Sequence, residues 1–311
     1  MNLLRKLFGH ESASTTDWRA VRSMLTPAER DHLFHAARDR FTGQGAILDL
    51  GTWLGGSTAA LAAGLKENRN EHAKSQKVHA FDLFELNSYL KQAYPYPELA
   101  DVPAGGSFLH VFQRNLAPWS TQVETHPGDF TKYDQPLGPV ELVHVDIMKN
   151  WALTNAVLRK FFRDLIPGVS MVLHQDFVHY NTVWIHLVMY RLRDHFDTVS
   201  HVPGSTTVEF KLRSAIPSSL LDHEYGFTDF GAVERQAAFA WSRSRISDTF
   251  LRFNIDAAEA MTPVHMGDRA CAEDLLSRAL AAEADYKAQH PEERRRSELA
   301  QVKARLEAMP K

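Results

Sequence analysis

Short apolar runs that end in polar residues recur along the middle of the chain, and helical patterns separate them. These runs lie at 46–50, 77–82, 122–126, 140–146 and 169–174. Alternation of short strands with amphipathic helices is typical of an α/β fold with a parallel sheet. Two further runs, at 197–201 and 206–212, flank Pro203-Gly204-Ser205 and predict an antiparallel hairpin.

Caps and apolar spacing predict the helices. Thr26 is the expected N-cap of a helix, with Pro27 at the first helical position and Glu29 completing a capping box. Apolar residues at helical spacing continue this helix to about Phe41. Further helices are expected at 57–66, 108–116, 151–165 and 178–196. Two connecting segments carry no such signal, a polar loop at 67–76 and an irregular surface insertion at 85–107.

The stretch from 47 to 58 turns from a strand into a helix through glycines. Asp49 near the strand end can accept hydrogen bonds from a ligand, and the start of the following helix offers free backbone N–H groups. Gly51 and Gly55 let the backbone approach a ligand or a neighbouring helix without an intervening Cβ. The G-x-G-x-x-G dinucleotide fingerprint is absent, and an ordinary strand-to-helix turn is the alternative interpretation.

Polar residues also follow other predicted strands. Asp82 ends the second strand, where an acid can bind both hydroxyls of a ribose, although a simple turn acid is the alternative. Asp146 ends a later strand, and Gln175-Asp176 follow the next one. Ligands of open α/β sheets bind at the carboxyl ends of the strands, so these side chains are candidates for one site.

The first of these patterns resembles a known family. The spacing D-x-G-x-x-x-G-x-S, from Asp49 to Ser57, resembles motif I of class I S-adenosylmethionine (SAM)-dependent methyltransferases, especially small-molecule O-methyltransferases. The resemblance implies a Rossmann-like, seven-stranded, mostly parallel sheet that ends in an antiparallel hairpin. Gly128-Asp129-Phe130 matches a step that lies beside the adenine in that family. The SAM contacts so implied are Asp49, Gly51, Thr52, Trp53, Gly55, Ser57, Asp82, Leu83, Phe84, Asp129, Phe130 and Asp146.

The later acids resemble the site of divalent-metal O-methyltransferases of the catechol type, and the macrocin O-methyltransferase group has a similar layout. The resemblance implies that Asp146, Gln175 and Asp176 hold Mg²⁺ and that Lys149 is the catalytic base. Two acids usually form the pair at 175–176 in the macrocin group. Gln175 therefore predicts a weaker Mg²⁺ site, because Mg²⁺ favours carboxylate oxygens.

Histidines near the same edge give a rival catalytic interpretation. His144, in the middle of a strand, is expected to be a satisfied core or sheet-face histidine. His174 could serve as base, ligand or structural residue, and His179 could face the acceptor as a base. Lys149 could instead be a solvated loop lysine.

Composition narrows the classes of partner. The 311 residues carry a formal net charge of -3, which gives no electrostatic pull toward nucleic acid or an anionic membrane. The single cysteine, Cys271, excludes an internal disulfide and fits a cytoplasmic protein. No apolar run is long enough to span a bilayer, and the basic, apolar segment 1–8 predicts a short helix rather than a signal peptide.

Three regions are expected: an N-terminal helical segment at 1–44, a SAM-binding methyltransferase domain at 45–214 and a mainly helical extension at 215–311. The extension could be a lid, a homodimer element or a partner-binding tail. The predicted function is methyl transfer from SAM to a hydroxyl of a small molecule, such as a sugar or a glycosylated metabolite, with or without Mg²⁺ assistance. The alternatives are other chemistry on SAM or its decarboxylated form, and a non-catalytic scaffold whose C-terminal helices bind a partner.

Overall fold

The computed structural model describes residues 17–309. The short helix expected at 1–8 lies outside these residues. Among the helices that the described part of the chain forms, none has both the length and the apolar character needed to cross a membrane.

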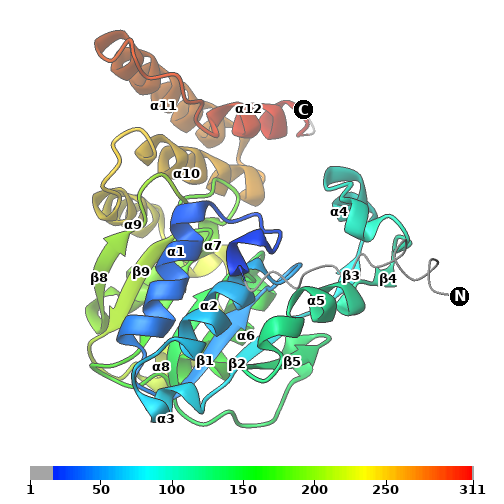
Figure 1. Ribbon diagram of the computed structural model, residues 1–311. Helices are drawn as coiled ribbons and strands as arrows, with labels where there is room; N and C mark the ends of the chain where they lie inside the picture. The colour runs from blue at the N-terminus through cyan, green and yellow to red at the C-terminus, as the bar shows by residue number, and fades with distance from the viewer. Residues whose placement is uncertain (1–16, 310–311) are drawn as a thin grey trace, which may run out of the picture.

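Seven strands form one mixed sheet in the order β5-β2-β1-β6-β7-β9-β8 (Figure 1). The strands β5, β2, β1, β6 and β7 run parallel, whereas β9 is antiparallel to both β7 and β8. Their bounds are β1 Ala46–Leu50, β2 Val78–Asp82, β5 Val123–Pro127, β6 Val140–Val145, β7 Met171–His174, β8 Phe196–His201 and β9 Val208–Leu212. The predicted Rossmann-like sheet with a terminal antiparallel hairpin is therefore confirmed.

The N-terminal helices form as their local sequence predicts. Helix α1 (Pro27–His35) starts with the capping box, because Thr26 accepts the N–H of Glu29 while the Glu29 carboxylate accepts the N–H of Thr26. A five-residue π-helical turn, Ala36–Arg40, continues it. Helix α2 (Gly56–Lys66) follows the glycine turn and packs against α1.

The segments expected to be irregular contain short elements. The polar loop at 67–76 holds α3 (Glu71–Lys74), capped by Asn70. The insertion at 85–107 holds β3 (Glu85–Leu86), α4 (Ser88–Ala93) and β4 (Gly106–Ser107), and β3 pairs with β4 as a separate two-stranded sheet. Helix α5 (Leu109–Asn115) follows the insertion.

Two predicted helices are shorter than expected. Helix α6 (Trp151–Lys160) gives way to a 3₁₀ turn, Phe162–Asp164, before the expected end at 165. Helix α7 (Val183–Leu192) begins at 183 rather than 178. The Thr182 hydroxyl lies within hydrogen-bond distance of the Asp176 and His179 carbonyls, which holds 176–182 in turns ahead of the helix.

The C-terminal extension is helical, as predicted. Its helices are α8 (Ser218–Leu221), α9 (Ala232–Arg245), α10 (Arg252–Met266), α11 (Arg269–Gln289) and α12 (Leu299–Glu307). Helix α9 packs against α7, α10 packs against α7 and α9, and α11 and α12 pack on α10. The last two helices form the outermost layer at the top of Figure 1.

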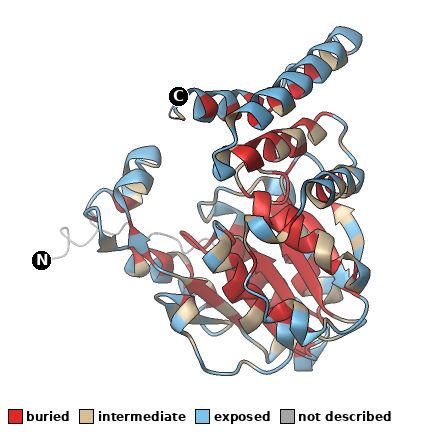
Figure 2. Ribbon diagram, turned by 180° about the vertical axis from the view of Figure 1, so that it is seen from behind, coloured by how far each residue is buried: buried red, intermediate tan, exposed pale blue. Residues whose placement is uncertain are grey.

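Helices cover both faces of the sheet, so the parallel strands are buried on each side. Every residue of β1 is buried, and its side chains alternate between two hydrophobic clusters. Ile47 joins the cluster formed with α1, α2 and α5, whereas Leu48 and Leu50 join the cluster formed with α6, α7 and the C-terminal helices. Figure 2 shows the resulting band of buried residues through the centre of the molecule.

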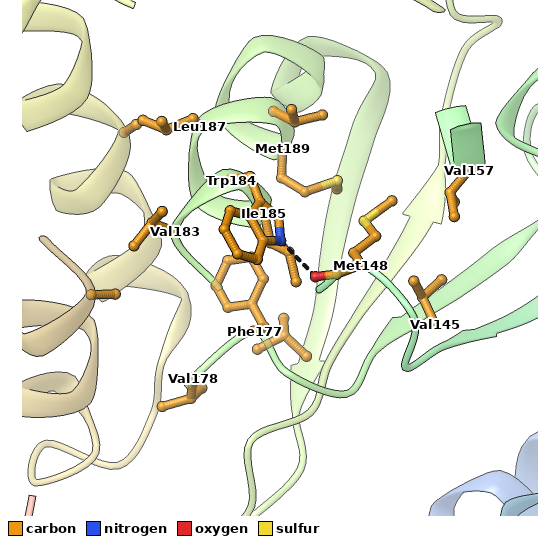
Figure 3. Packing of buried hydrophobic residues seen from close by; sticks show 14 of the residues in the cluster. Val145, Met148, Val157, Phe177, Val178, Val183, Trp184, Ile185, Leu187 and Met189 are labelled. Atoms are coloured by element: carbon orange, nitrogen blue, oxygen red, sulfur yellow. Dashed lines mark hydrogen bonds between the residues drawn. The ribbon is translucent and has the colours of Figure 1, made fainter. Parts of the chain in front are cut away.

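The loop after β6 is fixed to α7. Trp184 is buried, and its indole Nε1 donates to the carbonyl of Met148 at 2.5 Å (Figure 3). Met148 is itself buried among the side chains that line this core. The loop residue that follows, Lys149, therefore starts from a well-defined backbone position.

Substitution of Gly51 by alanine tests the packing of the glycine turn. Gly51 has φ +90°, and an added Cβ would lie 2.5 Å from the Asp146 carbonyl oxygen. We expect Gly51→Ala to lower the free energy of unfolding by at least about 1 kcal/mol more than Gly138→Ala, measured by urea unfolding.

Gly138 is the matched control for this comparison. It has φ +77°, and an added Cβ would meet no heavy atom within 4 Å. Gly138→Ala thus carries the cost of a left-handed alanine without a collision. Equal losses of stability in the two variants would contradict the tight packing of the turn.

Candidate functional site

Asp49 is committed to contacts within the protein. Its side chain is fully buried, one carboxylate oxygen accepts from Ser57 Oγ at 2.8 Å and Thr58 Oγ1 at 2.6 Å, and the other accepts from His144 Nδ1 at 2.8 Å. These three donors all belong to the chain, so the geometry gives Asp49 a structural role, and its contact with a ligand stays a prediction. Ser57 likewise points at Asp49 rather than outward.

His144 is a buried sheet-face histidine, as predicted. Burial lowers the pKa of His144, but the hydrogen bond and negative charge of Asp49 outweigh it, so the pKa is raised above its ordinary value. The hydrogen bond between His144 and Asp49 ties β6 to β1. The Nε2 of His144 is buried and has no partner among residues 17–309.

The two glycines of the turn serve contacts between elements. Gly51 approaches the Asp146 backbone after β6, and Gly55 lies against the side chain of Leu116. Both take left-handed φ angles, of +90° and +96°. Their need for glycine therefore comes from the neighbouring backbone and from the segment after α5, which is the second of the two roles expected from the sequence.

Asp82 lies at the end of β2 and faces the turn. Its carboxylate accepts the N–H of Trp53 at 2.9 Å and the N–H of Phe84 at 2.8 Å. Both donors have left-handed φ angles, of +48° and +53°, which are strained for residues other than glycine. Burial raises the pKa of Asp82, although these backbone hydrogen bonds oppose the shift.

The turn keeps polar atoms that the described residues do not satisfy. Thr52 Oγ1 and Trp53 Nε1 are buried without a partner within 17–309. A carboxylate such as that of Asp82 has about four lone-pair positions, so two acceptances leave capacity for further donors. Donors and acceptors of this kind fit a ligand with both hydroxyl and amino acid groups, as SAM has.

The other implied SAM contacts differ in their surroundings. Leu83 is exposed beside Asp82, whereas Phe84 and Phe130 are buried. Asp129 caps a short 3₁₀ turn by accepting hydrogen bonds from the hydroxyl and the N–H of Thr131. These hydrogen bonds lower the pKa of Asp129. The ring of Tyr94, from the 85–107 insertion, lies 6.1 Å from the ring of Trp53, so the insertion borders the turn.

Lys149 bridges two carboxylates at the neighbouring strand ends. Its Nζ donates to Asp146 Oδ1 at 2.5 Å and to Asp176 Oδ2. Asp146 follows β6 and Asp176 follows β7, so the neighbouring strands bring these two carboxylates together, as the sequence predicted. The lysine side chain is 48% exposed, against 21% and 14% for the two aspartates.

This bridge changes the protonation of its members. Burial raises the pKa of Asp146 to about 6, with the positive charge of Lys149 opposing and the negative charge of Asp176 adding to the shift. Burial alone would lower the pKa of Lys149, but both aspartates raise it above its ordinary value. Lys149 is therefore a charged ammonium at neutral pH, and its expected role as a base does not fit this arrangement.

The residues expected to hold Mg²⁺ do not fit that ion in this arrangement. The Lys149 ammonium lies between Asp146 and Asp176, where a cation bound to both would have to lie. The Gln175 amide nitrogen lies 3.2 Å from Thr206 Oγ1. Mg²⁺ needs near-octahedral oxygen coordination, and an ammonium held by both carboxylates opposes it by charge and by volume.

The candidate histidines His174 and His179 differ in burial. His174 is fully buried, its ring packs edge-on against Phe162 and Phe210, and neither ring nitrogen has a partner in the described chain. Burial lowers the pKa of His174 to about 3, which favours the structural alternative over a role as substrate base. His179 is 36% exposed, and its Nε2 lies 3.8 Å from Glu298 Oε1.

Glu298 is a site residue that the sequence did not reveal. It lies just before α12 and accepts the N–H of Tyr180 at 2.7 Å, 118 positions earlier in the chain. Burial raises its pKa, whereas the charge of His179 lowers it. No local motif marks this residue, because only the packing of the extension brings it to the loop after β7.

Several solved structures match the chain, and methyltransferases are among them. CalS11, a TDP-rhamnose 3'-O-methyltransferase of calicheamicin biosynthesis, is 18% identical over 60% of this chain and 77% of that chain, with a TM-score of 0.41. An O-methyltransferase from Bacillus cereus in complex with SAH is 15% identical over 63% and 84%, with a TM-score of 0.38. Cofactor-bound Rv0187 from MTB is 16% identical over 68% and 94%, with a TM-score of 0.40.

No protein-family profile and no curated protein matches the chain. At these identities and TM-scores the structural matches assign neither a substrate nor a reaction. Activity has to be inferred from the residues of this chain.

The buried state of His174 predicts a loss of stability in mild acid. Below an unfolded pKa of about 6.5 the unfolded chain takes up a proton that the folded chain, with a pKa of about 3, refuses. Stability therefore falls as pH drops from about 6.5 toward 3. We expect His174→Phe to reduce this slope by up to about 1.4 kcal/mol per pH unit, measured by urea unfolding at pH 7, 6 and 5.

His110→Phe is the control, since His110 is exposed on α5. Its pH slope should match that of the unmodified protein. An unchanged slope in His174→Phe would show that His174 takes up its proton in the folded state.

Proposed function

We propose that the chain is a SAM-dependent methyltransferase acting on a hydroxyl of a small molecule, such as a sugar or a glycosylated metabolite. The observation that carries the proposal is Asp82, a carboxylate at the end of β2 that receives the N–H of Trp53 from the glycine turn and the N–H of Phe84 from its own loop, and keeps acceptor capacity. In this proposal the ribose hydroxyls of SAM donate to the Asp82 carboxylate. Thr52 Oγ1 and Trp53 Nε1, which are buried without a partner within 17–309, take part in holding the ligand.

SAM supplies a methyl group on a positively charged sulfonium when it is bound, and the chain supplies alignment and charge. The acceptor hydroxyl lies toward the loops after β6 and β7, next to the Lys149 ammonium. This ammonium favours the ionised acceptor oxygen, and the two aspartates fix its position. Lys149 acts here as an electrostatic group and not as a base.

His179 is the proposed base. It is part-exposed at the same edge, and its Nε2 lies 3.8 Å from Glu298 Oε1. Proton transfer from the acceptor hydroxyl to a His179 ring nitrogen leaves an oxygen nucleophile beside Lys149. No step in this scheme needs a metal ion.

The regions keep the roles expected of them in this proposal. Residues 45–214 hold the cofactor and the charged bridge, and the 85–107 insertion borders the turn through Tyr94. The 215–311 extension contributes Glu298 to the acceptor side. A non-catalytic scaffold is the competing function, and cofactor binding separates the two.

Binding of S-adenosylhomocysteine (SAH), the product form of the cofactor, tests the first half of the proposal. By isothermal titration calorimetry we expect SAH to bind the full chain, and Asp82→Asn to weaken binding at least about tenfold, because an amide has one oxygen fewer to accept ribose donors. Asp101→Asn, at an exposed acid of the insertion, is the control and should bind like the unmodified protein. No binding at millimolar SAH would rule the enzyme out.

Methyl transfer from radiolabelled SAM to a panel of phenols and free sugars tests the second half. Lys149→Met should lower kcat at least about 100-fold, since it removes the charge that stabilises the oxyanion, while SAH affinity stays within about threefold. Lys303→Met, at an exposed lysine of α12, should leave both unchanged. Transfer should persist in EDTA.

Two results would contradict this mechanism. Loss of transfer in EDTA that Mg²⁺ restores would reinstate the metal. Tight SAH binding without transfer to any hydroxyl tested would favour the scaffold or a different reaction on SAM.

A further inference from the structure

A second group of chemically competent side chains lies at the edge of the sheet, apart from the proposed catalytic residues. His79 is on β2, and Glu124 and His126 are on the neighbouring edge strand β5. His79 pairs in register with Glu124, and Phe81 pairs with His126. Residues two apart on a strand share a face, so all three side chains project from the same side of the sheet.

The potential ligand atoms of these residues converge. His79 Nδ1 lies 3.0 Å from His126 Nε2, and His126 Nε2 lies 3.9 Å from Glu124 Oε1. One ligand atom from each residue lies within 4.8 Å of the others. Ligands at about 2.05 Å from a tetrahedral Zn²⁺ are about 3.3 Å apart. The separations of 3.0 and 3.9 Å bracket this value and the third is at most 4.8 Å, so side-chain adjustment would let the three share one ion.

We propose that His79, Glu124 and His126 bind a divalent transition-metal ion of the Zn²⁺ class, with water in the open coordination position. Two imidazoles and one carboxylate suit Zn²⁺ and its neighbours in the first transition row. Mg²⁺ and Ca²⁺ require oxygen-rich sites, so this set excludes them. The proposal is independent of the proposed methyltransferase function.

Aromatic neighbours and burial set the surroundings of the two imidazoles. The His126 ring stacks on Phe81 with centroids 4.3 Å apart and meets Tyr133 edge-on at 5.1 Å. Burial lowers the pKa of both His79 and His126, with neighbouring positive groups adding to the shift and Glu124 opposing it.

Metal binding also requires a change of tautomer in one ring. In the metal-free chain two ring nitrogens 3.0 Å apart must comprise one N–H donor and one acceptor. With an ion between them, both nitrogens present lone pairs, and the displaced proton moves to the other nitrogen of its own ring. Glu124 can serve the ion through Oε1 while Oε2 faces Lys77 Nζ at 3.6 Å.

The ion would tie the edge strand to the rest of the sheet. His126 is followed by Pro127, Gly128 and Asp129, and the Gly128 N–H donates to the carbonyl of Asp82 at 2.9 Å. A link between β2 and β5 at this point fixes the start of that loop. The expected effect is structural: a more stable edge strand, with no part in methyl transfer.

Calorimetric titration of Zn²⁺ into EDTA-treated, desalted full-length protein tests the proposal. We expect one equivalent to bind, and the Tm to rise with Zn²⁺ concentration because the ion binds the folded site. Co²⁺ in place of Zn²⁺ should give the visible absorption of a four-coordinate site. Mg²⁺ should produce neither heat nor a change in Tm.

Variants locate the ion. His126→Gln and Glu124→Ala should each weaken Zn²⁺ binding at least about tenfold, since even changes around metal ligands commonly cost 10–100-fold. Glu124 is exposed, so its variant keeps the test valid if His126→Gln fails to fold. His110→Gln is the matched control for loss of an exposed histidine, and its binding should be unchanged.

Two outcomes would overturn the proposed metal site. Equal Zn²⁺ binding by the unmodified protein and the Glu124→Ala and His126→Gln variants would place the ion on other histidines and overturn the proposal. Absence of binding would overturn it as well. SAH affinity measured in the same samples reports on the cofactor site separately, so failure of one proposal is distinguishable from failure of the other.

Discussion

The buried carboxylate of Asp49 is the constraint on which the architecture of this edge depends. A charge in the interior is tolerated only when its hydrogen-bonding positions are filled, and here α2 supplies two hydroxyls while β6 supplies an imidazole. One side chain thereby links the first strand, the helix that follows it and the central neighbouring strand. The glycine turn is held between these anchored elements, and Trp53 and Asp82 take their positions from it.

The bridge of Lys149 with two aspartates differs from the Asp49 cluster because it is partly open to solvent. Lys149 is enclosed by Asp146 and Asp176, yet nearly half of its side chain meets solvent. The aspartates fix its direction and keep it protonated, while its exposure leaves it able to meet a ligand. Asp49 organises the fold from inside, and Lys149 places an ammonium between two carboxylates where the strands end. The sheet makes both possible, because neighbouring parallel strands deliver their end residues to one edge.

Much of this arrangement follows from sequence. The apolar runs locate the seven strands, the capping box locates α1, and parallel strand ends bring Asp146 near Asp176. Other features depend on choices that a linear pattern does not encode. Strand alternation does not say that Asp49 turns toward α2, and spacing does not say which cation fills the gap between two acids. Glu298 approaches Tyr180 from 118 positions away, so only tertiary packing could reveal it.

The C-terminal extension shares its interior with the sheet. Phe210 of β9 stacks on Trp241 of α9 with centroids 6.1 Å apart, and Phe177 lies 5.3 Å from Phe210. A single hydrophobic cluster runs from the sheet through α7 into α9 and α10. A truncated protein that ends at residue 214 would therefore lack part of its hydrophobic core. Its sheet would expose aromatic side chains that favour aggregation, and it would lack Glu298 at the edge where Lys149 lies.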